Sequence, residues 1–124
     1  MIDFQNASFM KLNPTSDNDF ASWIMPMFVP GEKIIQSFRG IRDGVVFTNK
    51  RIFAINVQGF TGKKKDFTSL PYSKIQAFSV ETAGVLDMDS ELELWFSGMG
   101  KVKFEFVSRA NVSAICRVIS EHAL

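Results

Sequence analysis

Catalysis at a single centre needs nucleophiles, acids or bases at a suitable spacing, and this chain offers few of them. It has one cysteine, Cys116, and one histidine, His122. A Cys–His pair catalyses acyl transfer when the imidazole activates the thiol within one cleft. Both residues fall in a predicted C-terminal helix, where positions six apart lie on different faces. We therefore expect a buried, inert cysteine, a frayed terminal histidine and no catalytic residue. GxSxG, HExxH, P-loop and GxGxxG patterns are also absent from the sequence.

A string of acids, Asp87-x-Asp89-x-Glu91, is the second candidate for chemistry. Several carboxylates that converge within about 2.5 Å bind hard cations such as Ca²⁺. This string keeps a constant spacing of two, lacks the glycine of an EF-hand loop and runs directly into a predicted strand. Alternate residues of a strand point the same way, so the pattern favours a solvated acidic face. We expect no metal site and no cofactor.

Charge is unevenly distributed along a chain whose net charge is only +1. The stretch 32–65 has eight basic and two acidic residues, a balance of +6, and the stretch 66–105 has three basic and seven acidic residues, a balance of −4. If the fold separates the two stretches, the domain has a basic side and an acidic side. The candidate anion-binding or partner-binding residues are Arg39, Arg42, Lys50, Arg51, Lys63, Lys64 and Lys65.

The elements that position these charges are mostly strands. Short runs with period-two or continuous apolar patterns alternate with turn residues, without a helix between them, which predicts consecutive antiparallel hairpins. Asn49-Lys50 is a tight turn where asparagine suits a positive φ, and Gly59 and Gly62 bound a basic loop. The seven predicted strands are 34–38, 44–48, 51–57, 66–70, 75–82, 91–96 and 102–106.

Helical spacing marks both ends of the chain. Asn111 is a plausible cap for a C-terminal helix with one apolar stripe, which suits it to close the open end of a curled sheet. Residues 3–12 predict a short amphipathic helix that ends at Asn13-Pro14. A second helix begins at Ser16 or Asp17, and its stripe at helical spacing is expected to pack on the sheet rather than to bind a partner. That stripe consists of Phe20, Trp23, Ile24 and Met27.

Length and composition indicate a globular chain. Its 124 residues, 46% of them hydrophobic, are most simply one folded β domain at 32–124 preceded by a helical extension at 1–31. A single cysteine forms no internal disulfide, and the sequence opens without a signal peptide or an apolar run near 20 residues. We therefore expect a cytoplasmic protein.

Several linked motifs resemble those of the bacterial pleckstrin homology (PH) domain family. The segments FTNKRIFAINVQGFTGKKKDFTSLPYSKIQAFSVETAG and DMDSELELWFSG contain the TNKR turn, GxTGKK loop, PYxxI corner and SVETAG strand of that family. The resemblance implies a mainly β (α+β) fold. The expected fold is a PH-like barrel of seven antiparallel strands in two crossed sheets, capped by a C-terminal helix, here with an N-terminal helical extension. The resemblance also implies a tendency to form cyclic oligomers.

Two non-enzymatic functions fit these observations. A basic face and an acidic face on one protomer are complementary to each other, which suits head-to-tail assembly into a ring, and an exposed sheet edge suits strand addition. The alternative is weak contact of the basic loops with anionic membrane lipid headgroups. We expect an unknown protein partner, no small-molecule substrate and no nucleic acid, since the net charge is near zero and no RNP motif occurs. The candidate ring interface consists of Asp87, Asp89, Glu91, Glu93 and Trp95, with Phe60 and the Met99 turn as further apolar anchors.

Overall fold

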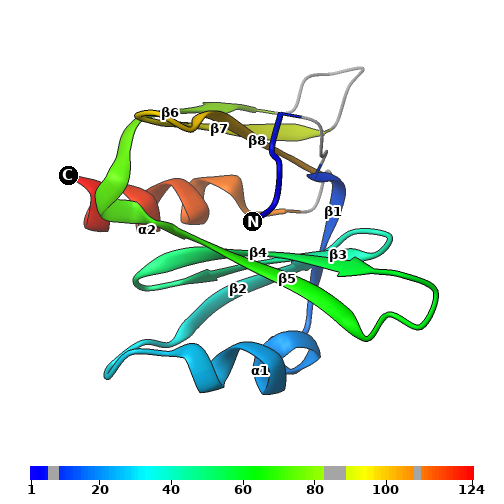
Figure 1. The fold of residues 1–124 in the computed structure, drawn as a ribbon. Helices are drawn as coiled ribbons and strands as arrows, with labels where there is room; N and C mark the ends of the chain where they lie inside the picture. The colour runs from blue at the N-terminus through cyan, green and yellow to red at the C-terminus, as the bar shows by residue number, and fades with distance from the viewer. Residues whose placement is uncertain (6–8, 83–88, 108–109) are drawn as a thin grey trace.

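One continuous sheet organises the molecule (Figure 1). The computed structural model describes residues 1–5, 9–82, 89–107 and 110–124. Within these ranges eight strands follow the spatial order β5-β4-β3-β2-β1-β8-β7-β6. The strands are β1 (Phe9–Thr15), β2 (Ile34–Arg39), β3 (Asp43–Thr48), β4 (Arg51–Gln58), β5 (Lys64–Pro71), β6 (Ile75–Glu81), β7 (Ser90–Phe96) and β8 (Gly100–Phe106). The seven predicted strands are confirmed as β2 to β8, but the structure adds β1.

Strand β1 corrects two expectations. The segment from Phe9 to Leu12 is a strand and not part of a helix, and it pairs in parallel with β8, whereas Asn13 to Thr15 pair antiparallel with β2. Because β1 is hydrogen-bonded on both sides, the strands form one mixed sheet that folds into two layers, not two separate antiparallel sheets (Figure 1). One layer contains β2 to β5, and the other contains β6 to β8.

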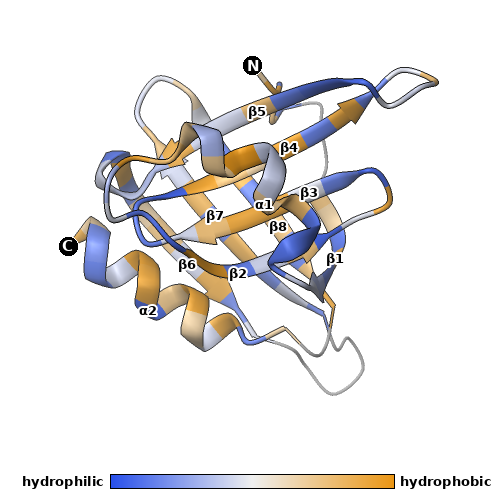
Figure 2. Cartoon of the chain, turned by 90° about the horizontal axis from the view of Figure 1, so that it is seen from below, coloured by the Kyte–Doolittle hydropathy of each residue, from blue (hydrophilic) through white to orange (hydrophobic). Residues whose placement is uncertain are grey.

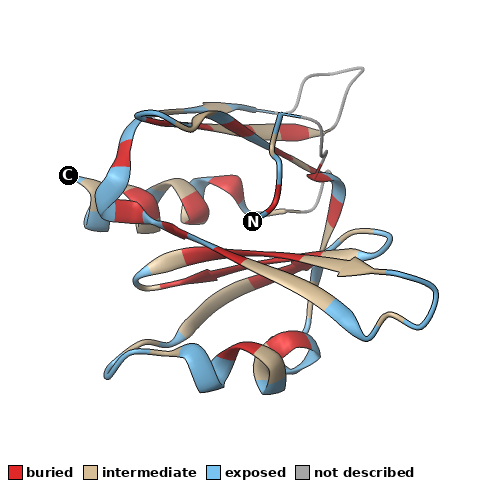
Figure 3. Ribbon diagram, in the orientation of Figure 1, coloured by how far each residue is buried: buried red, intermediate tan, exposed pale blue. Residues whose placement is uncertain are grey.

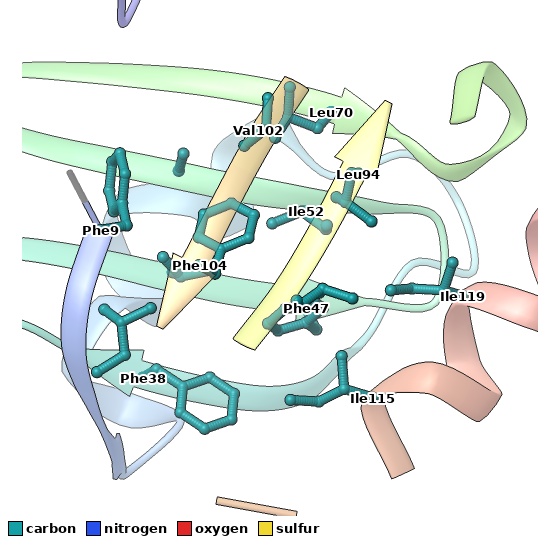
Figure 4. Packing of buried hydrophobic residues seen from close by; sticks show 14 of the residues in the cluster. Phe9, Phe38, Phe47, Ile52, Leu70, Leu94, Val102, Phe104, Ile115 and Ile119 are labelled. Carbon is teal, nitrogen blue, oxygen red and sulfur yellow. The ribbon is translucent and has the colours of Figure 1, made fainter. Parts of the chain in front are cut away.

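The main core lies between the two layers, where the inward residues of both meet α2 (Val112–Ala123). Figure 4 shows Phe38 and Phe47 near Ile115 of the helix, and Phe104 belongs to the same cluster. Figure 2 shows that the hydrophobic side of α2 faces the sheet. Asn111 caps α2 as predicted, since its Oδ1 accepts the Ala114 N–H at 3.1 Å. The helix thus closes the open side of the folded sheet.

A second, smaller core lies on the other face of β3 and β4 and contains Phe20, Trp23 and Ile24 of the predicted N-terminal stripe, whereas Met27, its fourth member, is 39% exposed. Helix α1 (Asn18–Ile24) is followed by the 3₁₀ turn η1 (Met25–Met27), and it buries Phe20 and Ile24 against Val46, Phe53 and Ile55. Figure 3 shows buried residues of α1 facing the sheet. Strands β3 and β4 are therefore covered on both faces, which explains their continuous apolar runs.

Asn49 joins β3 to β4 by a mechanism that differs from the one expected. Its φ is not positive. Its side chain instead ties the turn to the segment after η1, because its Oδ1 accepts the Lys33 N–H at 2.8 Å and its Nδ2 donates to Gly31 O at 3.0 Å. At the far end of β5 the 3₁₀ turn η2 (Tyr72–Lys74) leads into β6, and buried Tyr72 donates its hydroxyl to Thr48 O at 2.7 Å.

The N-terminus is attached to β5. The amino group of Met1 lies 3.0 Å from Asp66 Oδ2, and buried Ile2 donates its N–H to Thr68 Oγ1. In the part of the chain that the structure describes, every helix is too short or too polar to cross a bilayer.

Candidate interaction surfaces

The seven candidate basic residues divide between the two ends of the β2–β5 layer. Lys50 and Arg51 lie at the β3–β4 turn, whereas Arg39 and Arg42 flank the β2–β3 loop and Lys63 to Lys65 flank the β4–β5 loop at the opposite end (Figure 1). A single site that includes all seven side chains is therefore excluded by the strand lengths between the two ends.

Arg51 is occupied by the protein itself. Its Nε and Nη2 donate to the two oxygens of Glu32 at 2.9 Å and 2.8 Å, Nη2 donates also to Met27 O at 2.6 Å, and the guanidinium covers the Phe53 ring. The Glu32 side chain has no exposed surface. Burial opposes ionisation of Glu32, but hydrogen bonds from Arg51, the Val29 N–H and Thr48 outweigh it and hold its pKa below the ordinary value. This pair is structural, because it holds η1 and the following segment on the sheet.

Arg39 and Lys65 lie against α1. Arg39 forms an ion pair with Asp19 at 3.4 Å and lies over the Phe20 ring, and the hydroxyl of Thr15 donates to the same Asp19 carboxylate. The Thr15 hydrogen bond and then the Arg39 charge lower the Asp19 pKa. Lys65 Nζ lies 4.6 Å from the centre of the Trp23 ring. These two cations therefore contribute to the attachment of α1 to the sheet.

The β2–β3 loop (40–42) and the β4–β5 loop (59–63) lie side by side, and together we call them the paired-loop tip. Arg42 Nη2 donates to Gly59 O at 2.5 Å and so connects them. Beneath them Asn56 Nδ2 donates to Asp43 Oδ1 at 2.8 Å across β3 and β4, and burial raises the pKa of the Asp43 carboxyl. Gly59 and Gly62 have positive φ, which only glycine adopts without strain, so the second loop turns tightly.

Two large apolar side chains project from the paired-loop tip. Ile41 is 98% exposed and Phe60 is fully exposed, and Arg42, Lys63 and Lys64 are exposed beside them. Figure 3 shows the ends of both loops in the colour of exposed residues on the same side of the molecule. Sequence reasoning named Phe60 only as an anchor for a ring and missed Ile41. The signal that was available is an isoleucine within a polar turn, Arg39-Gly40-Ile41-Arg42-Asp43.

The acidic face lies on the outer surface of the β6–β8 layer. Strand register places Glu81, Glu91 and Glu105 directly across from one another, and we call these three residues the acidic row. Lys103 Nζ lies 3.2 Å from Glu91, and that hydrogen bond and charge raise the Lys103 pKa. In the next row Glu93 lies 3.8 Å from Lys101. Lys101 and Lys103 therefore partly neutralise acids that the sequence analysis assigned to a ring interface.

The remaining interface candidates have different environments. Trp95 is half exposed opposite exposed Ala77, beside a hollow of about 210 Å³, as expected of an outward residue on β7. Met99 is partly buried against the main core and is not a free anchor. Asp89 directly precedes β7. Asp87 lies outside the described residues.

The two residues considered for catalysis both lie in α2, and His122 lies within this helix and not at a frayed end as expected. Cys116 is half-buried, and exposed His122 has its Nδ1 2.8 Å from Val118 O and its ring beside Tyr72. Across residues 1–5, 9–82, 89–107 and 110–124, no group of three His, Cys, Asp or Glu side chains is arranged to hold a metal ion.

Comparison with known families decides the classification. The family model described as "Bacterial PH domain" matches residues 3–123. The chain belongs to the bacterial PH domain family. Two Bacillus subtilis (strain 168) proteins are related to it. The uncharacterized protein YjqA is 51% identical over 72 residues, which are 58% of each chain, and YozO is 32% identical over 77% of this chain and 82% of YozO. The matched region thus spans little more than half of YjqA.

Solved structures have the same fold. A DUF1696 family protein with a pleckstrin-homology domain from Shewanella loihica PV-4 superimposes with a TM-score of 0.79 at 38% identity, covering 93% of this chain and 99% of that one. A pleckstrin homology domain from Shewanella amazonensis SB2B gives a TM-score of 0.66 at 38% identity, covering 96% and 93%. A PH-domain-containing protein from Exiguobacterium sibiricum 255-15, 22% identical with a TM-score of 0.67, agrees in fold.

Proposed function

We propose that this bacterial PH domain is a binding and scaffold module that assembles with copies of itself into a closed ring and presents that ring to a protein partner. The observation that carries the proposal is the arrangement of the two sheet edges. Strands β5 and β6 are the first and last strands of one continuous sheet, so each has one side without a neighbouring strand in the described chain. Unpaired edges of this kind accept strands from other chains.

The two edges are suited to each other in length and direction. Strand β5 has eight residues and β6 has seven. Antiparallel addition of β5 to the β6 of a second protomer places the start of β5 against the end of β6. Each protomer then uses one edge on each side, which is a heterologous contact that closes into a ring when the rotation allows.

Charge supports the same pairing. Lys65 lies at the start of β5 on the same face as Phe67, which is the outer face of the sheet, where α1 packs. Glu81 lies at the end of β6 on the outer face of the other layer, in the acidic row. Antiparallel pairing brings Lys65 of one protomer near Glu81 of the next. The basic start of β5 thus replaces the full set of seven basic residues as the partner of the acidic face.

The alternative of headgroup binding by all three basic turns has less geometric support. Lys50 lies at the opposite end of the layer from Lys63, and Arg51 is occupied by Glu32. Within the β2–β5 layer, the paired-loop tip keeps Arg42, Lys63 and Lys64 exposed together. We infer a binding role rather than catalysis, because the exposed side chains that the fold brings together at the paired-loop tip are cations and apolar groups.

Light scattering coupled to size-exclusion chromatography tests the proposal. The wild-type chain is expected to elute as one discrete multiple of its 14.0 kDa mass, with dissociation at high salt. Glu81→Lys is expected to dissociate the ring because it places like charges at the pairing edge, and adding Lys65→Glu is expected to restore it. Lys50→Glu, a reversal at the far turn, is the matched control. A wild-type monomer at all salt concentrations, or a Glu81→Lys variant that assembles normally, contradicts the proposal.

A further inference from the structure

We propose that the segment between α1 and β2 docks an acidic amphipathic helix of a protein partner. The surface consists of the apolar residues at 25–30 with two cations beside them, Lys33 and Lys50, and we call it the methionine platform. The inference rests on the proposed function in one respect, the expectation of a protein partner, and it does not depend on ring assembly. It adds the place where that partner binds and the chemistry that the partner has.

The methionine platform exposes a continuous run of apolar residues. All six residues at 25–30, Met-Pro-Met-Phe-Val-Pro, are apolar, and only Phe28 among them is not exposed. Met25 is 56% exposed, Met27 39% and Val29 48%. Figure 3 shows the chain from η1 to the start of β2 mostly in the colour of exposed residues. A single exposed apolar side chain is ordinary, but a contiguous group of them indicates an interaction site.

Phe28 explains why its neighbours face outward. Its ring stacks on Phe53 with 6.0 Å between the ring centres, and it packs against the second core. The backbone at Phe28 is extended, so the side chains on either side of it point away from the sheet. Met27 and Val29 are therefore at the surface because Phe28 anchors the segment from below.

The buried Glu32–Arg51 pair makes the methionine platform rigid before a partner binds. Arg51 Nη2 donates to Met27 O at 2.6 Å, and Glu32 Oε1 accepts the Val29 N–H at 3.0 Å. The two prolines of the segment restrict its backbone further. A surface that is ordered in advance loses less conformational entropy on binding, so more of the contact energy appears as affinity.

The backbone of the methionine platform favours a helical partner over an extended one. The carbonyls of Met25, Met27 and Val29 accept hydrogen bonds from within the protein. The two prolines have no N–H to donate. The segment therefore lacks the row of free backbone groups that addition of a strand requires. A helix satisfies its own backbone groups, and flexible methionine side chains adapt to the apolar face of a helix.

Charge favours an acidic partner. Lys33 and Lys50 are both exposed, and Asn49 bonds to the Lys33 N–H and to Gly31 O, so the β3–β4 turn lies against the end of the methionine platform. Glu32 is the one acid within residues 25–33 and 49–51, and its side chain has no exposed surface. The exposed charge of this surface is therefore positive, which attracts acidic side chains and repels basic ones.

Phage display of a random peptide library on the immobilised wild-type chain tests this inference. The selected peptides are expected to have apolar residues at helical spacing and an excess of Asp and Glu. A synthetic peptide of the consensus sequence is then the probe. Met25→Ala and Met27→Ala are each expected to weaken its binding about ten-fold, and Lys50→Gln about two- to five-fold. Met10→Ala is the matched control, because Met10 is 52% exposed on β1, outside the methionine platform.

NMR of the methionine methyl groups locates the bound peptide. The Met25 and Met27 signals are expected to shift when the peptide is added, whereas those of Met10 and Met99 are expected to stay unchanged. The ring-disrupting Glu81→Lys variant is expected to bind the peptide with unchanged affinity per protomer, because each protomer has a complete methionine platform. A failure of ring assembly would therefore leave this result intact.

Three results overturn the inference. The first is a selection that yields no binder or yields basic peptides. The second is a consensus peptide whose binding both Met25→Ala and Met27→Ala leave unchanged. The third is a Met27→Ala variant with a smaller mass in light scattering than the wild-type chain, which would assign this surface to a second copy of the chain.

Discussion

The two ends of the β2–β5 layer contain similar residues in opposite roles. At the β3–β4 turn the guanidinium of Arg51 is enclosed by Glu32, Met27 O and the Phe53 ring. At the paired-loop tip Arg42 bonds to one backbone carbonyl, and its neighbours Lys63 and Lys64 extend into solvent. The first end holds the chain together, and the second presents cations and apolar side chains outward. Residue type alone therefore does not distinguish a structural cation from a binding cation. The groups that surround each cation in the folded protein distinguish the two roles.

The largest expected effect is at the enclosed end. Arg51→Ala leaves the Glu32 carboxylate buried without its cation, and removal of one partner of a buried pair lowers the free energy of unfolding by about 3–5 kcal/mol. Urea denaturation measures the loss. Lys50→Ala, at the exposed neighbouring position, is the control and is expected to change stability by no more than about 0.5 kcal/mol. Equal effects of the two changes would mean that Arg51 is not structural.

An intermediate effect is expected where α1 meets the layer between the two ends. A methyl group at Gly44 would overlap the ring of buried Phe20, so Gly44→Ala should destabilise the fold by about 1–3 kcal/mol through overpacking. Gly40→Ala, at the tip, is the matched control, because its methyl group would meet only ordinary contacts with Leu12 and Asp43. Thermal unfolding compares the two. A neutral Gly44→Ala would show that α1 packs more loosely on β3 than described.

A smaller stability effect is expected at the tip. Arg42→Ala removes the bond to Gly59 O at an exposed site, which should lower the free energy of unfolding by about 1 kcal/mol or less. Urea denaturation measures the change. A loss of stability as large as that of Arg51→Ala would abolish the contrast between the ends.

The smallest expected effect is on the pH dependence of the free energy of unfolding. Glu32, at the enclosed end, and Asp43, beneath the paired-loop tip, should contribute to it with opposite signs. The Glu32 pKa is lowered in the fold, so its contribution to stability is complete above its ordinary pKa of 4.5 and is lost as pH falls through the lowered value. The Asp43 pKa is raised, so ionisation of this carboxyl opposes folding, and its favourable contribution below 3.8 is lost as pH rises through the raised value.

Urea midpoints between about pH 3 and about pH 7 measure both slopes. The stability difference between wild type and Glu32→Gln should shrink on acidification. Asp43→Asn should remove a slope of the opposite sign. If both substitutions change the pH dependence of the free energy of unfolding in the same direction, the opposite roles assigned to Glu32 and Asp43 are wrong.

The strand pattern from residue 34 onward was predictable, because alternation in β7 and β8 and continuous apolar runs in β3 and β4 are local signals. The N-terminal strand was not. In β1 the buried residues Phe9 and Leu12 are three apart, which imitates helical spacing. The cause is a register irregularity between them at Lys11, whose φ is 52°. Pairing with β8, nearly a hundred residues away, and with β2 establishes this strand.

The candidate surfaces were predictable in part. The separation of basic and acidic stretches was visible in the sequence, and the acidic row on the outer face of β6–β8 agrees with it. The internal pairing of Glu91 with Lys103 and of Arg39 with Asp19 was not visible, because these partners meet only across strands or across layers. The exposure of Ile41 was missed for the same reason, since burial depends on what the rest of the chain covers.

By itself the sequence determined the family, the order of strands β2 to β8 and the two helices that cover the sheet, because periodicity and turn residues act over a few neighbouring positions. The tertiary structure alone decided that the sheet is continuous through β1, which charges are consumed by internal partners, and which side chains remain outside. Those outcomes depend on contacts between residues far apart in the chain. No local pattern specifies such contacts.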